Sequence, residues 1–381
     1  MIKHFFIAFL TLLLSACFGF FDSDNSPAPT PLTAITTEVH PRLLWSAKVG
    51  SGANGEYLKL SPSISGNAIY TASANGVVTA VNKTSGQILW RTNTKVSVTS
   101  GPGVGDGTVV VGSRRGDVIA LDQATGRIRW QSSLLGEILA KPAVGNQMAV
   151  VKAVDGHVHA YAISDGRELW SYIQSEPNLI LRGSSAPLLH GNALFIGFAN
   201  GQLIKFNARN GQVDWMHAIA IPTGAFSIQR MVDIDADPVI FEHRLFAATY
   251  QGNIASLDWN SGRTLWTHDI SSYTGMSADP STIYITDAPG NVWAFGVNSG
   301  LVNWRQTNLV ARQLSAPAAM GQYVVVGDGE GYLHWLSKRD GHFAAREFVG
   351  NTILAAPMVE NNILYALTSQ GSLVAYTLSA S

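Results

Sequence analysis

The acidic run from Asp233 to Asp237 is the first candidate for chemistry, because alternate carboxylates also open the calcium loop of EF-hands. That loop needs glycine at its sixth position and glutamate at its twelfth, where this chain has Pro238 and Arg244. His157 and His159 would share one face of a strand, as metal ligands can, but no third ligand lies near them in the sequence. No nucleophile–base pattern or phosphate-binding loop stands out. We therefore expect no catalytic residue, no metal site and no cofactor.

The composition narrows the class of protein. The chain has 381 residues, of which 13% are charged and 46% hydrophobic, and it contains 37 glycines. This profile is typical of an all-β protein with many tight turns. The formal net charge is −1, and the aromatic residues are not interleaved with Lys and Arg, which argues against nucleic-acid binding. No apolar run after residue 21 is long enough to span a bilayer.

Residues 1–16 are expected to be a signal peptide. Lys3 supplies the positive start, and an apolar run too short to cross a membrane follows at 5–14. The run ends in Leu-Ser-Ala-Cys at 14–17, which resembles the lipobox of bacterial lipoproteins. The resemblance implies cleavage before Cys17, the only cysteine, and attachment of lipid to it. An ordinary secretory signal with an incidental cysteine is the alternative.

The segment after the cysteine is expected to be a tether. Residues 17–41 are rich in Ser, Thr and Pro, and we interpret them as a lipidated cysteine with a flexible linker. Phe18 stands where an aspartate would signal inner-membrane retention, so by the same resemblance we expect the outer membrane. The lipid is then the only membrane contact, and the folded part lies on the periplasmic side.

Residues 42–381 repeat one motif eight times, at intervals of roughly 40 residues. Each copy begins at a turn glycine and is preceded by an apolar run; the glycines are Gly76, Gly116, Gly156, Gly201, Gly252, Gly290, Gly331 and Gly371. Short apolar runs separated by glycine turns predict antiparallel strands, four per repeat. We predict an all-β, eight-bladed β-propeller of four-stranded antiparallel blades. A solenoid is the alternative, but its coils need no such hairpins.

The two ends of the chain each carry part of a repeat. The eighth copy stops at Ser381 without its fourth strand, whereas residues 42–49 match a fourth strand with no repeat before it. We predict that this N-terminal strand completes the last blade and closes the ring. Trp45 occupies the position at which six other fourth strands also have tryptophan, which predicts packing between blades. The seventh blade has Ala345 there.

Two consecutive connections between blades are longer than the others. They span 17 residues from Trp170 to Pro187 and 23 from Trp215 to Pro238, against 12 in the first two blades. An apolar patch with charged residues at its rim predicts a partner-binding site. The candidate partner-binding residues are Leu179, Ile180, Leu181, Arg182, Arg230, Asp233 and Asp235, with Ile221, Phe226 and Met231 as further apolar residues. Folding of both loops back onto their own blades is the alternative.

The repeat resembles that of quinoprotein alcohol dehydrogenases, which form eight-bladed propellers. Their function rests on adjacent cysteines, a calcium ion held by carboxylates and a catalytic aspartate. Because this chain has a single cysteine, the resemblance implies the fold without the activity. We expect that the protein is not an enzyme.

The whole mature chain resembles the BamB lipoprotein family of the β-barrel assembly (BAM) machinery. The most specific stretches are LILRGSSAP at 179–187 and IQRMVDIDADP at 228–238. The resemblance implies a scaffold that binds the POTRA domains of BamA, and through BamA the BAM complex, and that assists folding and insertion of outer-membrane β-barrels. It implies contact roles for Leu179, Leu181, Arg182, Asp233 and Asp235, with Ile180 and Arg230 adjacent. Whether the two aspartates contact the partner or position Arg182 stays open.

Two further expectations can be tested. The alternative function is a chaperone that binds unfolded barrel precursors by pairing their strands with an exposed blade edge. Arg114, in the hairpin of the second blade, is expected to lie on the same face as Arg182 but two blades away. We expect its substitution to have almost no effect on partner binding.

Overall fold

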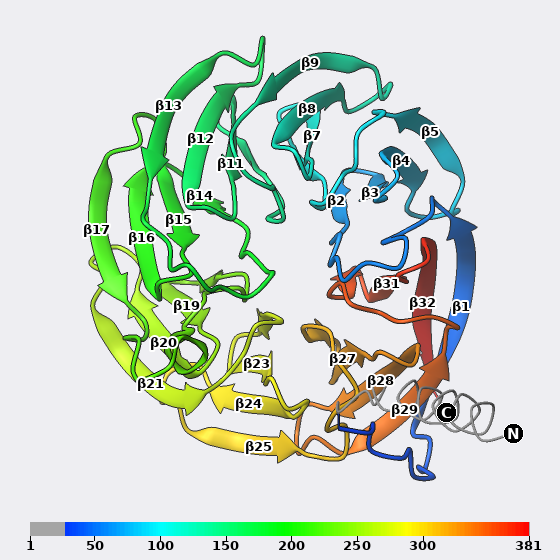
Figure 1. Ribbon diagram of the computed structural model, residues 1–381. Helices are drawn as coiled ribbons and strands as arrows, with labels where there is room; N and C mark the ends of the chain where they lie inside the picture. Colours follow the sequence, from blue (N-terminus) through cyan, green and yellow to red (C-terminus); the bar gives the residue numbers. More distant parts are fainter. Residues whose placement is uncertain (1–26, 381) are drawn as a thin grey trace, which may run out of the picture.

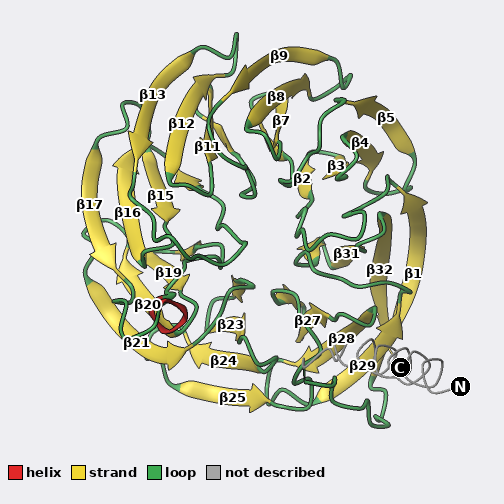
Figure 2. Ribbon diagram, in the orientation of Figure 1, coloured by secondary structure: helices red, strands yellow, loops and turns green. Residues whose placement is uncertain are grey.

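In the computed structural model, residues 27–380 are described, so Cys17 and the residues around it lie outside the described part. Eight four-stranded antiparallel sheets surround a central axis (Figure 1). Strands and loops make up nearly all of this part, together with the short 3-10 helix η1 (Ser227–Arg230), red in Figure 2. The predicted eight-bladed propeller is therefore confirmed.

The first four blades follow one another along the chain, each running from its inner to its outer strand. Blade one has β2 (Ser63–Ser65), β3 (Ala68–Ala72), β4 (Val77–Asn82) and β5 (Ile88–Asn93). Blade two has β6 (Gly103–Gly105), β7 (Thr108–Gly112), β8 (Asp117–Asp122) and β9 (Ile128–Ser133). Blade three has β10 (Ala143–Gly145), β11 (Met148–Lys152), β12 (His157–Ala162) and β13 (Glu168–Ile173). Blade four has β14 (Leu188–His190), β15 (Ala193–Gly197), β16 (Gln202–Asn207) and β17 (Val213–Ala218).

The last four blades complete the ring, and only the eighth departs from chain order. Blade five has β18 (Val239–Phe241), β19 (Arg244–Ala248), β20 (Gly252–Asp258) and β21 (Thr264–Ile270). Blade six has β22 (Met276–Ala278), β23 (Thr282–Thr286), β24 (Val292–Gly296) and β25 (Val302–Gln306). Blade seven has β26 (Ala318–Met320), β27 (Tyr323–Gly327), β28 (Tyr332–Ser337) and β29 (Phe343–Phe348). Blade eight has β30 (Met358–Glu360), β31 (Ile363–Leu367), β32 (Ser372–Ala380) and β1 (Val39–Lys48).

The second and third strands of each blade are mostly apolar and mostly buried because neighbouring blades cover both of their faces. All five residues of β7 are buried, for example, whereas β9 alternates exposed and less exposed residues. Tight hairpins join these strands. Gly76 has φ +88°, and a Cβ there would lie 2.5 Å from the carbonyl oxygen of Val96, so only glycine fits. The repeat in the sequence is thus the repeat of these hairpins.

Tryptophans of the outer strands join each blade to the next. Trp90 of blade one donates a hydrogen bond from Nε1 to the carbonyl of Gln123 in blade two (3.0 Å). Its ring covers Gly126, where a Cβ would lie 2.5 Å from the indole. The same hydrogen bond and glycine recur for Trp45, Trp130, Trp170, Trp215, Trp266 and Trp304. The predicted packing between blades therefore depends on a glycine in the turn of the following blade.

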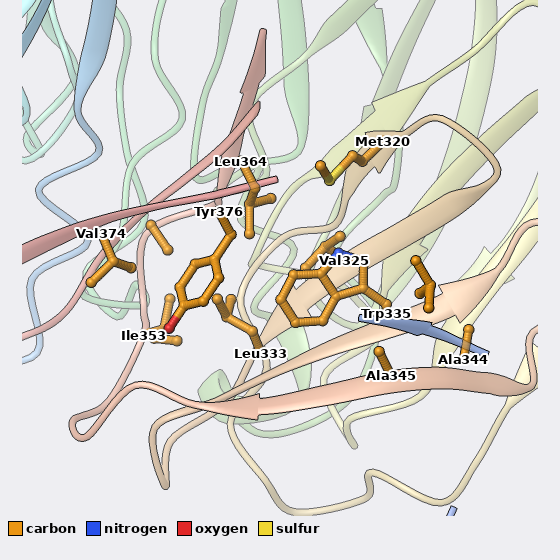
Figure 3. Close-up of a cluster of buried hydrophobic side chains, with 12 residues drawn as sticks. Met320, Val325, Leu333, Trp335, Ala344, Ala345, Ile353, Leu364, Val374 and Tyr376 are labelled. Carbon is orange, nitrogen blue, oxygen red and sulfur yellow. The ribbon is translucent and has the colours of Figure 1, made fainter. Parts of the chain in front are cut away.

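Blade seven exchanges the two residues of this arrangement. In blade one, Ala80 on the third strand pairs with Trp90 on the fourth, but in blade seven Trp335 on the third strand pairs with Ala345 on the fourth. Trp335 is fully buried and packs with Tyr376 of blade eight (Figure 3). Blade eight has no turn between its third and fourth strands, because its fourth strand comes from the other end of the chain. A tryptophan at 345 would have no such glycine to cover.

The N-terminal strand closes the ring as predicted. In Figure 1, β1 (blue) lies beside β32 (red), and the two pair antiparallel from Val39 opposite Ala380 to Lys48 opposite Ser372. The strand starts at Val39, and residues before it also contact the propeller. Arg312 Nη1 donates to the carbonyl of Thr30 (2.9 Å), and the amide of Glu38 donates to the carbonyl of Ala344 (2.8 Å). Contacts with the propeller therefore begin before the expected boundary at residue 42.

One face of the ring carries the long connections. The fourth strand of each blade ends beside the hairpin that joins the second and third strands, as shown by the hydrogen bond from the amide of Ile219 to the carbonyl of Gly201 (2.9 Å). We call this the connection face; the turns between the third and fourth strands lie on the opposite face. Within residues 27–380, no helix has the length and apolar character needed to cross a membrane.

Candidate partner-binding surface

The two enlarged connections start beside each other on the connection face. The first joins β13 to β14 through residues 174–187, and the second joins β17 to β18 through residues 219–238 and contains η1. The side-chain oxygen of Gln229 accepts hydrogen bonds from the amides of Ala225 (3.1 Å) and Phe226 (3.2 Å), which fixes the start of η1. The second connection thus has a defined conformation around η1.

The apolar residues of these connections divide between the surface and the core. The exposed fractions are 44% for Leu179, 74% for Ile221, 69% for Phe226 and 62% for Ile228. Met231 differs, because it is 7% exposed and belongs to the core. Folding back onto the blades therefore accounts for Met231, and also for the buried Ile219, Val232 and Ile234, while the other four residues are exposed apolar side chains. Ile180 and Leu181 are half-buried, and Arg230 is exposed at the end of η1.

Two of the three aspartates of the second connection are buried, and Asp237 is exposed. Asp233 is 1% exposed and Asp235 is 4% exposed. Oδ1 of Asp233 accepts a hydrogen bond from the amide of Leu181 (2.8 Å), and Oδ1 of Asp237 accepts one from the amide of Ala186 (2.7 Å). Neither of the two roles left open by the sequence describes Asp233, because its carboxylate holds the main chain of the first connection. Burial raises the pKa of Asp233 to about 6.

Arg182 is held by two glutamates from other parts of the ring. Its Nη2 lies 3.0 Å from Oε1 of Glu137 and 3.4 Å from Oε2 of Glu56. Glu56 belongs to the connection between β1 and β2, and Glu137 to the one between β9 and β10. The side chain of Arg182 is still 47% exposed. Its Nε and Nη1 donate to no residue within 27–380, so these donors remain available for a partner.

Arg114 belongs to the same ion-pair network. Its guanidinium contacts Glu56, and its Nε lies 3.7 Å from Oε1 of Glu137. The expectation that Arg114 is distant from the candidate site is therefore wrong, because two carboxylates connect it to Arg182. Sequence reasoning missed Glu56 and Glu137, since only the ring closure brings these parts of the chain together. The hydrogen bond from Arg114 lowers the pKa of Glu56.

A cleft opens beside Arg182 on the connection face. Its volume is about 390 Å³, and its lining includes Tyr57, Leu181, Arg182, Asp235, Tyr250 and Tyr273. Lys59, at the wall, donates from Nζ to the carbonyls of Tyr273 (2.6 Å), Asp235 (3.3 Å) and Thr274 (3.4 Å). The cleft therefore joins the first connection to residues of other blades, and the candidate surface extends beyond the two loops.

The other candidates for chemistry have local partners. The rings of His157 and His159 stack with centroids 6.2 Å apart, and Nδ1 of His159 hydrogen-bonds to Glu168 (3.0 Å). In residues 27–380, no group of three or more His, Cys, Asp or Glu side chains is arranged to hold a metal ion.

Comparison with solved structures places the fold among known propellers. BamB from Moraxella catarrhalis superposes with a TM-score of 0.82 at 27% identity, over 89% of this chain and 100% of that one. The quinohemoprotein alcohol dehydrogenase from Comamonas testosteroni has a TM-score of 0.72 at 12% identity, over 88% of this chain and 76% of that one. The second likeness concerns the fold alone.

Comparison with curated sequences identifies the family. The family model described as outer membrane protein assembly factor BamB matches residues 74–306 and 298–380. The proteins of that name from Legionella pneumophila and Pseudomonas aeruginosa are 44% and 45% identical to this chain. The first alignment covers 92% of this chain and 91% of the relative, and the second covers 99% of each. With this coverage, together with the closed propeller and its two long connections, the chain belongs to the BamB family of outer membrane protein assembly factors.

Proposed function

We propose that this protein is a non-enzymatic scaffold lipoprotein of the β-barrel assembly complex. It binds the POTRA domains of BamA and assists the folding and insertion of outer-membrane β-barrel proteins. The name shared by its relatives supports the place in assembly. The observation that carries the binding role is Arg182, which is held in place yet exposed beside Leu179 on the connection face.

The exposed residues take direct roles in this proposal. Leu179 is an apolar anchor, and truncation of such a residue at an interface costs about 1–3 kcal/mol. Arg182 donates from Nε and Nη1 to a carboxylate or carbonyl of the POTRA domain. Arg230 lies beside the exposed Phe226 and Ile228 and contributes to the rim.

The half-buried and buried residues support these contacts. Ile180 and Leu181 continue the apolar surface, and Asp233 holds the amide of Leu181 so that the first connection keeps its shape. Because Asp233 is buried and its carboxylate is used within the chain, the surface of contact beside it comes from its neighbours. Loss of Asp233 would therefore weaken partner binding through the conformation of residues 179–182.

The direct test is recovery of the partner. The full-length protein, tagged at its C-terminus, is expressed in a Gram-negative host lacking its own copy, and outer membranes are solubilised in mild detergent. We expect BamA among the proteins that co-purify with the tagged chain. If BamA is absent from the eluate while the tagged protein is folded and abundant, the proposal fails.

The membrane attachment is a separate part of the proposal. Cys17, the sole cysteine, follows a signal sequence and would carry the lipid on the periplasmic face of the outer membrane. Cys17→Ser should leave an uncleaved precursor without the lipid mass, as measured by intact-protein mass spectrometry. A normally cleaved and lipidated product from this variant would contradict the anchor.

A second candidate function is direct binding of unfolded barrel precursors. The outer strand of each blade is paired on one side only, and several such strands expose apolar residues, including Leu89 (52%) and Leu43 (50%). An extended peptide can add to such an edge through main-chain hydrogen bonds. Photocrosslinkers at Leu89 and Leu43 test it: labelled precursor captured in the absence of BamA supports this function, and no capture contradicts it.

A further inference from the structure

The cleft beside Arg182 has aromatic walls. Tyr57, Tyr250 and Tyr273 line it, and the rings of Tyr250 and Tyr273 meet edge to face with centroids 6.2 Å apart. Tyr57 is 46% exposed, so its ring reaches the mouth of the cleft. A volume of about 390 Å³ holds a single long side chain rather than a strand or a helix. The walls therefore suit a flat or linear group that packs against aromatic rings.

An unpaired carboxylate lies in the wall of this cleft. Asp235 is 4% exposed, and its carboxylate packs against Gly183, where a Cβ would lie 2.3 Å from Oδ2. Lys59 donates to the main-chain carbonyl of Asp235, and within residues 27–380 no hydrogen bond reaches the carboxylate itself. A buried carboxylate without a donor is costly, so this site favours a ligand that brings one.

The neighbouring charges leave an excess of carboxylates. Oδ2 of Asp233 and Oε2 of Glu176 are buried without a hydrogen-bond partner, whereas the other oxygen of each accepts a hydrogen bond from a main-chain amide. Lys152 donates a hydrogen bond to the carbonyl of Gly197, and Lys59 donates to three main-chain carbonyls. Lys152 thus has four carboxylates around it, those of Glu176, Asp233, Asp235 and Asp237, while the hydrogen bonds of Lys152 and Lys59 go to the main chain.

We propose that this cleft receives one basic side chain of the partner protein, with the tyrosine rings packing around it and the Asp235 carboxylate accepting its hydrogen bonds. The inference rests on the proposed function, because the partner supplies the side chain. Arginine fits best, since a guanidinium stacks on aromatic rings and donates two hydrogen bonds to one carboxylate. The partner would then be bound at two neighbouring points. Arg182 would donate hydrogen bonds to it, and Asp235 in the cleft would accept hydrogen bonds from it.

The titration of Asp235 agrees with this geometry. Burial raises its pKa to about 7, although Lys59 and Lys152 oppose the rise, and Asp233 and Glu176 add to it. The site thus disfavours an uncompensated negative charge, and a bound cation would supply the missing compensation.

The experiment uses small probes and no partner. The full chain is labelled with 3-fluorotyrosine and purified in detergent, and the fluorine signals of Tyr57, Tyr250 and Tyr273 are assigned by Tyr→Phe substitution. N-acetyl-arginine amide is titrated against the neutral isostere N-acetyl-citrulline amide, with N-acetyl-lysine amide as a second cation. We expect a saturable shift of the cleft tyrosines with arginine, a smaller one with lysine, and at least tenfold weaker binding of citrulline.

Two variants and a control define the site. Asp235→Asn should abolish the preference for arginine over citrulline, and Tyr57→Leu should weaken arginine binding several-fold while leaving the fold intact, because Tyr57 is partly exposed. Asp165→Asn, in an exposed turn on the opposite face, should titrate as the unsubstituted protein does. Equal binding of arginine and citrulline, an unchanged preference in Asp235→Asn, or no saturable shift would overturn the inference. Such a result would leave recovery of BamA untouched, whereas failure to recover BamA would refute the proposed function whatever the probes do.

Discussion

Arg182 is the residue at which separate parts of the candidate surface meet. Arg182 lies in the connection between β13 and β14, and the two glutamates that hold its guanidinium come from other connections of the chain. Since the glutamates engage only Nη2, they orient the side chain and leave Nε and Nη1 for the contact that we propose with the partner. Glu56 and Glu137 are therefore positioning residues for Arg182, and their effect on binding should pass through it.

A double-mutant cycle measures this coupling. Glu137→Gln keeps the shape of the side chain but removes the charge, so Arg182 should lose part of its preferred orientation. We expect affinity for BamA to fall by about 0.5–1 kcal/mol, the usual range for an exposed ion pair. In an Arg182→Ala background the same substitution should have no effect. Tighter binding by Glu137→Gln, or an equal loss in both backgrounds, would show that the glutamate does not act through Arg182.

The raised pKa of Asp235 makes the stability of the fold depend on pH. Its pKa rises from 3.8 in the unfolded chain to about 7 in the fold, so the folded state holds its proton more tightly. The resulting stability is present below about pH 4 and is lost as the pH rises towards 7. Asp235→Asn cannot ionise, so it should already stabilise the fold at pH 5, where the unfolded carboxyl is ionised, and stabilise it by on the order of 2–3 kcal/mol more at pH 8.

Urea unfolding of Asp235→Asn and of the unsubstituted protein, at pH 5 and at pH 8, checks this prediction for stability. The quantity to compare is the difference between variant and parent, because Asp233 and Glu176 also have raised pKa values and titrate in the same range. A difference that does not change between pH 5 and pH 8, or that favours the parent at pH 8, would contradict the assignment.

At the scale of strands and connections, the repeating features of the sequence were the predictable ones. Hairpin glycines and outer-strand tryptophans recur in nearly every blade, and the structure uses them in the same way each time. Connection length likewise pointed to residues 174–187 and 219–238. Glu56 and Glu137 gave no such signal. The burial of Asp233 was equally hidden, because an acidic run in a loop normally faces solvent.

The contact between Trp90 and Gly126 tests the packing rule for neighbouring blades. Trp90→Ala should cost about 3–5 kcal/mol through the cavity it leaves. Gly126→Ala should be strongly destabilising, because the new Cβ would collide with the indole and the residue has φ +71°. In the Trp90→Ala background the collision with the indole is gone, so Gly126→Ala should cost less: the backbone strain of about 1 kcal/mol and a close contact with Oγ1 of Thr92 remain. Denaturant unfolding gives the four free energies, and strictly additive losses would show that the two residues do not act as a unit.

At the scale of the whole molecule, closing the ring creates the site as well as the fold. β1 completes blade eight, Trp45 docks on blade one at Gly86, and the chain then leads directly to Glu56 and Tyr57 on the connection face. Residues of blades far apart in the sequence thereby surround one cleft beside Arg182. We propose that the propeller holds connections from several blades in fixed positions, so that a partner can recognise them together.

The affinity of Arg182→Glu for the isolated POTRA domains of BamA tests whether Arg182 contacts the partner. The matched control is Arg209→Glu, because Arg209 is also exposed and belongs to blade four, but lies in a turn on the opposite face. Circular dichroism and melting temperature establish that both variants are folded. We predict at least a hundredfold loss of affinity for Arg182→Glu, about 3 kcal/mol, and unchanged affinity for Arg209→Glu. Binding by Arg182→Glu as tight as that of the unsubstituted protein would contradict the account.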